Sequence, residues 1–65
     1  MLHFTEREIM TIRLLADGKT NDEIAQKLFI SVHTVKKNIE NIFEKTNLHN
    51  RVQIAVYAYK NGLIE

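Results

Sequence analysis

The chain has 65 residues, of which 45% are hydrophobic and 26% are charged, with a net charge of +1 and no cysteine. A chain this short buries only about 60% of the surface that it exposes when unfolded, which leaves room for one small domain but not for a deep substrate cleft. The lack of cysteine excludes disulfides and zinc–thiolate sites. With no proline and two glycines to interrupt helices, the composition favours an all-α domain over residues 1–65.

The first predicted helix spans about residues 5–17. It begins with a capping box, in which the Thr5 hydroxyl accepts a hydrogen bond from a backbone N–H and Glu8 reaches back to the N–H of the cap. It ends at Gly18, a residue type that readily adopts the left-handed conformation of helix ends. Its apolar residues recur at helical spacing and are predicted to face the core: Ile9, Ile12, Leu15 and Ala16.

Two further helices are predicted over residues 20–27 and 31–46, and the turn between them is Leu28-Phe29-Ile30. A second capping box begins the shorter helix at Thr20, and a serine caps the longer one. The small side chain of Ala25 permits a close crossing of the two helices. A short helix, a tight turn and a longer capped helix are the layout of a helix-turn-helix.

The helix over residues 31–46 has an apolar side and a polar side. The apolar side consists of Val32, Val35, Ile39, Ile42 and Phe43, and the polar side of His33, Lys36, Lys37, Glu40, Asn41 and Glu44. In a helix-turn-helix the first turns of the second helix enter the major groove of DNA, and here those turns carry His33, Lys36 and Lys37. An ordinary helical pair with a solvated face has the same pattern. The pattern alone therefore leaves open both DNA binding and a general helical interaction module.

The last predicted helix spans about residues 50–61, after Asn47 has ended the preceding helix in a left-handed conformation. It runs from a third capping box, at Asn50 and Gln53, to Asn61-Gly62. It carries two apolar stripes, whereas a peripheral helix of a monomer needs only one. The stripe with small residues is assigned to the core and consists of Ile54, Ala55 and Ala58, with Tyr57 alongside. The other stripe is predicted to be an exposed homodimer interface and consists of Val52, Val56 and Tyr59. The alternative is one broad core stripe with a stray exposed valine.

The sequence predicts neither a catalytic site nor a metal site. Ser31 is the only serine and lies where a helix cap is needed, and no two of the three histidines, His3, His33 and His49, have i, i+4 spacing. No glycine-rich phosphate loop is present. No apolar run approaches the roughly 18 residues of a membrane span. We therefore expect no enzymatic activity, no cofactor, no metal, no small-molecule ligand and no membrane partner.

Several segments, in register, resemble one family: Phe4 to Glu8, Thr20 to Ala25, Ile30 to Lys36 and Arg51 to Ile64. They are similar to LuxR-type (LuxR/FixJ/NarL/GerE) DNA-binding domains over nearly the whole chain. The resemblance implies a four-helix domain that binds double-stranded DNA through its third helix and forms a homodimer through its fourth. Such domains are usually the output end of cytoplasmic bacterial response regulators or quorum-sensing receptors. We expect the C-terminal effector domain of a two-component response regulator that binds an inverted-repeat promoter site and contacts RNA polymerase.

The resemblance also assigns DNA contacts residue by residue. Thr34 matches a family threonine that contacts backbone phosphate, Lys36 a position that contacts bases or phosphates, and Lys37 a variable groove-facing position. Thr20 and Asn21 match residues at the start of the second helix that bind phosphate, where exposed N–H groups attract anions. Together with the polar side of the third helix, the predicted DNA contacts are Thr20, Asn21, His33, Thr34, Lys36, Lys37, Asn38 and Glu40.

Two of these positions depart from the family pattern. Asn38 stands where the family frequently has histidine, and Glu40 stands where some relatives have a basic residue. Glu40 can accept a hydrogen bond from a cytosine amine, or it can pair with Lys36 or Lys37 about one turn away. Glu40, Glu44 and the low net charge favour the alternative function, a helical protein-interaction module that has kept the fold and lost DNA binding.

Glu8 and Arg51 also match strongly patterned family positions. We expect them to form an ion pair that links the fourth helix to the first. Such a pair contributes little to stability if it is exposed, and it is costly to break if it is buried.

Overall fold

The structure is a computed structural model that describes residues 3–64. Within that range the chain forms only helices, which confirms the all-α prediction: α1 (Glu6–Ala16), α2 (Asn21–Leu28), α3 (Val32–Thr46) and α4 (Arg51–Lys60). The predicted bounds differ from these by a single residue where they differ, mostly because the prediction counted capping residues as helical. One assignment was wrong: Leu28 is the last residue of α2, so the turn of the helix-turn-helix is residues 29–31.

The capping boxes at Thr5 and Thr20 form as predicted, each with its glutamate three residues later. The third box is only half correct. The Asn50 side chain accepts a hydrogen bond from the Gln53 N–H at 2.9 Å, but Gln53 Oε1 accepts from the N–H of His49, at 2.7 Å. Asn50 has a more extended backbone than the threonine caps, with φ −153° against −71° and −75°. This difference changes which N–H group faces the glutamine.

Left-handed residues end the helices at the predicted places. Gly18, Asn47 and Gly62 have φ values of 81°, 57° and 70°. Phe29 also adopts this conformation, with φ 56°. The sequence did not predict it, since a residue with a Cβ is disfavoured there by roughly 1–2 kcal/mol. Phe29 ends α2 and lets the Ile30 N–H donate to the Ala25 carbonyl at 3.1 Å, which makes the turn tight.

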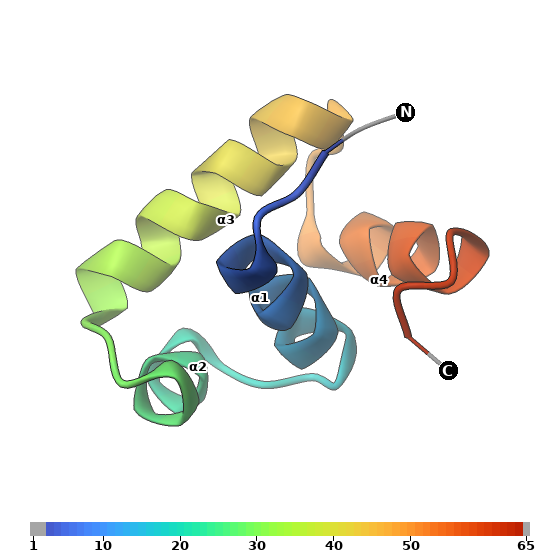
Figure 1. Cartoon of the computed structure of the whole chain (residues 1–65). Coiled ribbons are helices and arrows are strands. Elements are labelled where there is room, and N and C mark those ends of the chain that lie inside the picture. Colours follow the sequence, from blue (N-terminus) through green and yellow to red (C-terminus); the bar gives the residue numbers. More distant parts are fainter. Residues whose placement is uncertain (1–2, 65) are drawn as a thin grey trace.

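α1 is the central helix of the fold. It packs against each of the other helices, and α2 packs in addition against α3 (Figure 1). The buried apolar side chains come from all four helices. Of the stripe predicted for α1, Ile12 and Leu15 are buried, whereas Ile9 and Ala16 are only half-buried. The full set is Ile12, Leu15, Ile24, Ala25, Val35, Ile39, Ile42, Ile54 and Ala58. The core thus fixes α3 along one side and leaves its other side free.

The predicted ion pair between Glu8 and Arg51 does not form. Glu8 is 5% exposed, and its Oε1 accepts hydrogen bonds from Lys45 Nζ at 2.6 Å and from the Thr5 N–H at 2.8 Å. Burial raises the pKa of Glu8, but the hydrogen bonds from Lys45 and Thr5 outweigh it, and the pKa is lowered. Arg51 lies instead beside the start of α2.

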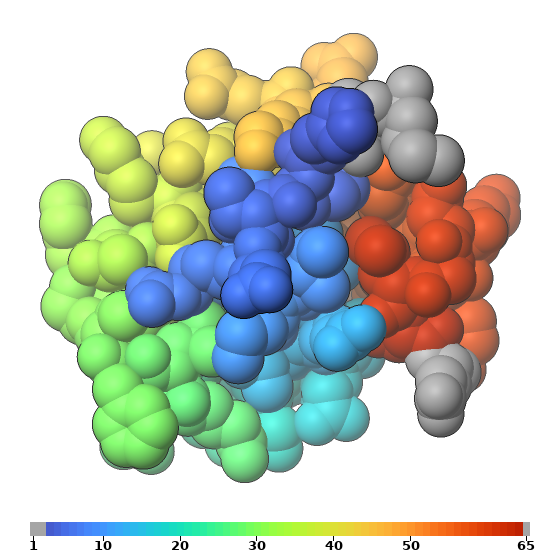
Figure 2. Space-filling model, in the orientation of Figure 1, coloured from blue at the N-terminus to red at the C-terminus, as the bar shows by residue number. Residues whose placement is uncertain are grey.

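Lys45 joins the end of α3 to the segment that precedes α1. Its Nζ donates to the His3 carbonyl at 3.1 Å and lies 5.8 Å from the centroid of the Phe4 ring. Phe4 in turn meets the Tyr57 ring of α4 edge-on, with centroids 6.1 Å apart. Figure 2 shows this segment lying between the end of α3 and α4.

Candidate nucleic-acid interface

The amino end of α3 is organised by Ser31. Its Oγ accepts a hydrogen bond from the Thr34 N–H at 3.0 Å, and it lies 3.0 Å from the Thr34 hydroxyl oxygen. This cap explains why the helix starts at Val32. Thr34, predicted to contact phosphate, is therefore half-buried in the first turn with its hydroxyl held toward Ser31.

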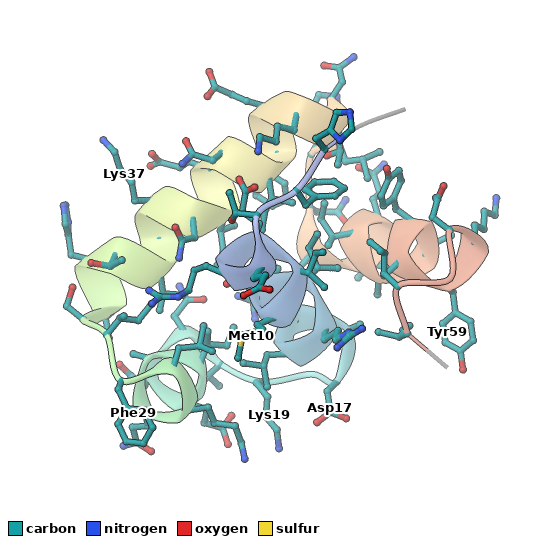
Figure 3. All side chains as sticks on the ribbon, viewed as in Figure 1. Met10, Asp17, Lys19, Phe29, Lys37 and Tyr59 are labelled. Carbon is teal, nitrogen blue, oxygen red and sulfur yellow. The ribbon has the colours of Figure 1, made fainter. Side chains whose placement is uncertain are left out.

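The charge on the free side of α3 changes from positive to negative along the helix. Val35 and Ile42 on the packed side are 0% exposed, whereas the residues predicted as the polar side are all exposed: His33, Lys36, Lys37, Glu40, Asn41 and Glu44. The lysines of this side lie in the amino half and the glutamates in the carboxyl half. Figure 3 shows Lys37 pointing away from the body of the protein. Only the amino half of this side therefore favours contact with a polyanion.

Asn38 lies on the flank of α3 rather than on its free side. It is half-buried, and its Nδ2 is buried without a hydrogen-bond partner. An amide in this state loses no hydrogen bond when it turns outward. Its predicted contact with DNA thus requires a rotation of the side chain and stays a prediction.

Glu40 does not pair with the lysines of its own helix. Within residues 3–64 the ion pairs are Lys19–Asp17, at 3.6 Å, and Lys45–Glu8, at 2.6 Å. The order of the residues explains why Glu40 forms no such pair, because a lysine that precedes a glutamate on a helix is the less favourable arrangement. The intrahelical alternative for Glu40 was therefore wrong.

The start of α2 lies beside the start of α4. Thr20 is the exposed cap, and Asn21 is the first residue of the helix. Arg51 connects the two helices: its Nη2 donates to Asn21 Oδ1 at 2.7 Å, and its Nη1 donates to the Lys19 carbonyl at 3.1 Å. A hollow of about 270 Å³ opens here, lined by Asn21, Lys36, Ile39, Glu40, Phe43 and Arg51. Three of the predicted DNA-contact residues and Arg51 thus meet at one place.

Sequence reasoning missed Arg51 as a member of this site. No local signal could have found it, because its partner Asn21 is 30 residues away along the chain. The sequence showed its charge and its place in the first turn of α4, but not which group would accept its hydrogen bonds.

The two stripes of α4 face as predicted, except that Ala55 of the inner stripe is only half-buried. Ile54 and Ala58 are 0% exposed, whereas Val52, Val56 and Tyr59 are 71%, 48% and 67% exposed. Val52 and Val56 line a groove of about 330 Å³, and Figure 3 shows Tyr59 pointing away from the protein. The outer stripe is available to a partner. The homodimer itself stays a prediction.

Among residues 3–64, no group of three histidine or acidic side chains could hold a metal ion. No helix in the same range is long and apolar enough to span a membrane.

A helix-turn-helix whose second helix offers cationic side chains from its first turns defines a class of DNA-binding domain. Residues 2–58 match the family described as bacterial regulatory proteins, luxR family. The chain belongs to this family and is a DNA-binding domain of the kind found in bacterial transcriptional regulators.

Full-length regulators contain relatives of this chain. It is 48% identical over 60 residues to the transcriptional regulatory protein LiaR of Bacillus subtilis, a match that covers 92% of the chain and 28% of LiaR. It is 39% identical over 61 residues to the response regulator protein VraR of Staphylococcus aureus, covering 94% of the chain and 29% of VraR. The chain thus spans less than a third of the length of these curated relatives.

Proposed function

We propose that this chain is the DNA-binding domain of a two-component response regulator and binds a specific site in double-stranded DNA. The observation that carries the proposal is the free, cationic amino half of α3 in a chain of the luxR family. The names of the relatives, one of which is called a response regulator, support the regulatory setting. A regulator of this kind acts on promoters, which places it in the bacterial cytoplasm, and it contacts RNA polymerase there.

In the proposed complex the amino half of α3 lies in the major groove. His33, Lys36 and Lys37 reach base edges and the flanking phosphates, because they are the exposed donors of the first turns. Thr20 and Asn21 meet a phosphate at the start of α2. Thr34 contacts phosphate beside them. These contacts place the helix in register before any base is read.

Asn38 and Glu40 are proposed to refine sequence preference. The buried Nδ2 of Asn38 gains its first hydrogen bond when the amide turns to the DNA. Glu40 has no ion-pair partner within residues 3–64, so its carboxylate can accept a hydrogen bond from a cytosine amine. A carboxylate also repels phosphate, which penalises a misplaced helix.

The exposed stripe of α4 is proposed to pair two copies on an inverted repeat. Val52, Val56 and Tyr59 form a patch too small for tight association in solution, so pairing is expected mainly on DNA. Twofold symmetry then requires half-sites about one helical turn, or 10 bp, apart. Val56→Asp should abolish cooperative binding to a palindrome in a gel shift and spare binding to a single half-site. Unchanged cooperativity would move the interface elsewhere.

A protein-interaction module is the second candidate. The free carboxylates Glu40 and Glu44 in the carboxyl half of α3 favour it, as does the net charge of +1. Such a module would bind duplex DNA weakly at any salt concentration.

The test is the salt dependence of binding to a mixed-sequence duplex, measured by fluorescence anisotropy. Each phosphate contact contributes about 0.9 to the slope of log affinity against log salt, so Lys36→Ala and Lys37→Ala should each lower the slope by about one. Lys27→Ala is the matched control, because it removes an exposed lysine from the other end of α2. A parent protein with no salt-dependent binding would leave the interaction module as the better account.

A further inference from the structure

Arg51 belongs neither to the buried core nor to the groove-facing side of α3. It is exposed, yet its guanidinium is fixed by hydrogen bonds to the Lys19 carbonyl and the Asn21 side chain. It also lines the hollow that contains Lys36. We propose that Arg51 is a positioning residue for DNA binding, which orients the Asn21 amide so that its N–H groups are ready to meet a phosphate. This inference rests on the proposed function.

The orientation follows from the chemistry of the two side chains. An asparagine amide has an oxygen that only accepts hydrogen bonds and a nitrogen that only donates them. Because Asn21 Oδ1 accepts from Arg51 Nη2 at 2.7 Å, the oxygen is held toward α4 and the nitrogen is directed away from it. A phosphate needs donors, and an amide turned by half a rotation would present its oxygen instead. Arg51 removes that unproductive rotamer.

The second hydrogen bond makes the guanidinium a fixed support. Arg51 Nη1 donates to the Lys19 carbonyl at 3.1 Å, which anchors the planar group between two acceptors of the same segment. A lysine could keep the charge at this position, but its single ammonium lacks the forked arrangement of donors. The guanidinium has five N–H donors, so those left over are hydrated by the solvent.

The surroundings of the hollow favour a phosphate at this place. The capping box satisfies the N–H groups of Thr20 and Glu23, whereas those of Asn21 and Asp22, the first two residues of α2, have no partner inside the helix. Lys36 contributes a second positive charge from α3. Glu40 is the one carboxylate that lines the hollow, and its charge offsets only part of that of Lys36 and Arg51.

A residue that merely fastened α4 to α2 would affect stability alone. The decisive experiment is therefore a double-mutant cycle on DNA affinity, with Arg51→Lys, Asn21→Ala and the double variant. Affinity for a mixed-sequence duplex is measured by fluorescence anisotropy, because phosphate contacts do not depend on sequence. Thermal melts by circular dichroism report stability separately.

We expect Arg51→Lys to bind about tenfold more weakly, which is the usual effect of losing a hydrogen bond to a charged group. The double variant should bind no more weakly than Asn21→Ala, since Arg51 acts through Asn21. The salt slope of Arg51→Lys should stay close to that of the parent, because the charge is retained. Arg13→Lys is the matched control: Arg13 also bonds a backbone carbonyl, that of Leu63, at 2.8 Å, but it lies on α1 away from the hollow.

Two results would overturn the inference. If Arg51→Lys binds DNA with the affinity of the parent, the forked donors of the guanidinium are not needed. If the losses of affinity multiply in the double variant, Arg51 does not act through Asn21. Arg51→Gln, which removes both the forked donors and the charge, should lose at least as much affinity as Arg51→Lys. If the parent and Lys36→Ala behave as proposed while the Arg51 variants bind like the parent, only this inference fails. Failure of the parent to bind DNA would overturn both.

Discussion

The two ends of α3 use the same residue type in opposite ways. Lys36 and Lys37 near the amino end are exposed and take part in no ion pair within residues 3–64. Lys45 near the carboxyl end donates to the buried Glu8 carboxylate at 2.6 Å and to the His3 carbonyl at 3.1 Å. A lysine attracts an external polyanion only where no internal acceptor already neutralises it. The same charge therefore holds the fold together at one end and faces the solvent at the other.

This comparison also explains why net charge was a poor guide. The chain as a whole carries +1, but the lysines and glutamates on the free side of α3 are separated along the helix, and Lys45 is not available to a partner. A DNA duplex placed against the amino half meets mainly positive charge. What decides binding is the local arrangement of unpaired charges.

The largest expected effect on stability comes from removing the contact of Lys45 with Glu8 at the carboxyl end of α3. Lys45→Met leaves the Glu8 carboxylate buried without its main partner, which should lower the free energy of unfolding by about 1–3 kcal/mol in a urea melt. Lys36→Met is the matched change at the amino end, and it should alter stability by no more than about 0.5 kcal/mol. Equal losses for the two variants would contradict the division between the ends.

The second prediction concerns the pH dependence of stability that results from the same contact between Glu8 and Lys45. The pKa of Glu8 lies below its ordinary value of 4.5 in the folded protein, so the folded state takes up a proton less readily than the unfolded chain. The stability that this carboxylate contributes is present above pH 4.5, the ordinary pKa of the group. It is lost as the pH falls through the lower pKa of the folded state. Glu8→Gln should therefore flatten the decline of melting temperature with acid. The exposed Glu23, whose pKa is lowered by hydrogen bonds within its capping box, accounts for part of the remaining slope.

The smallest effect is expected at the turn of the helix-turn-helix. Phe29 is left-handed at φ 56° and 95% exposed (Figure 3), so Phe29→Gly should stabilise the protein by about 1 kcal/mol. Asn47→Gly is the control, because asparagine tolerates the left-handed conformation better and less is gained. A destabilised Phe29→Gly, measured by thermal melt, would mean that the aromatic ring makes contacts that its exposure does not reveal.

The sequence predicted what is decided locally. The caps at Thr5, Thr20 and Ser31 act within four residues, and each helix starts where its cap indicates. The division of α4 into an inner and an outer stripe also follows from helical spacing, which places Ile54 and Val56 on different sides.

The errors concern choices that no local pattern decides. Glu8 is paired with Lys45, 37 residues away, and Arg51 with Asn21, 30 residues away. Charge complementarity allowed either cation for Glu8, and only the packing of α1 against the end of α3 selects between them. The left-handed Phe29 is the same kind of case, since the tight turn imposes a conformation that the residue type does not favour.

The central claim is that DNA meets the amino half of α3 together with the starts of α2 and α4. The most direct measurement is a titration of the ¹⁵N-labelled protein with a mixed-sequence duplex, followed by the backbone amide shifts. We predict the largest changes at residues 20–22 and 31–37 and at Arg51, with little change around Lys45. Shifts concentrated around Lys45 or along α1, or no shifts at any DNA concentration, would contradict the account.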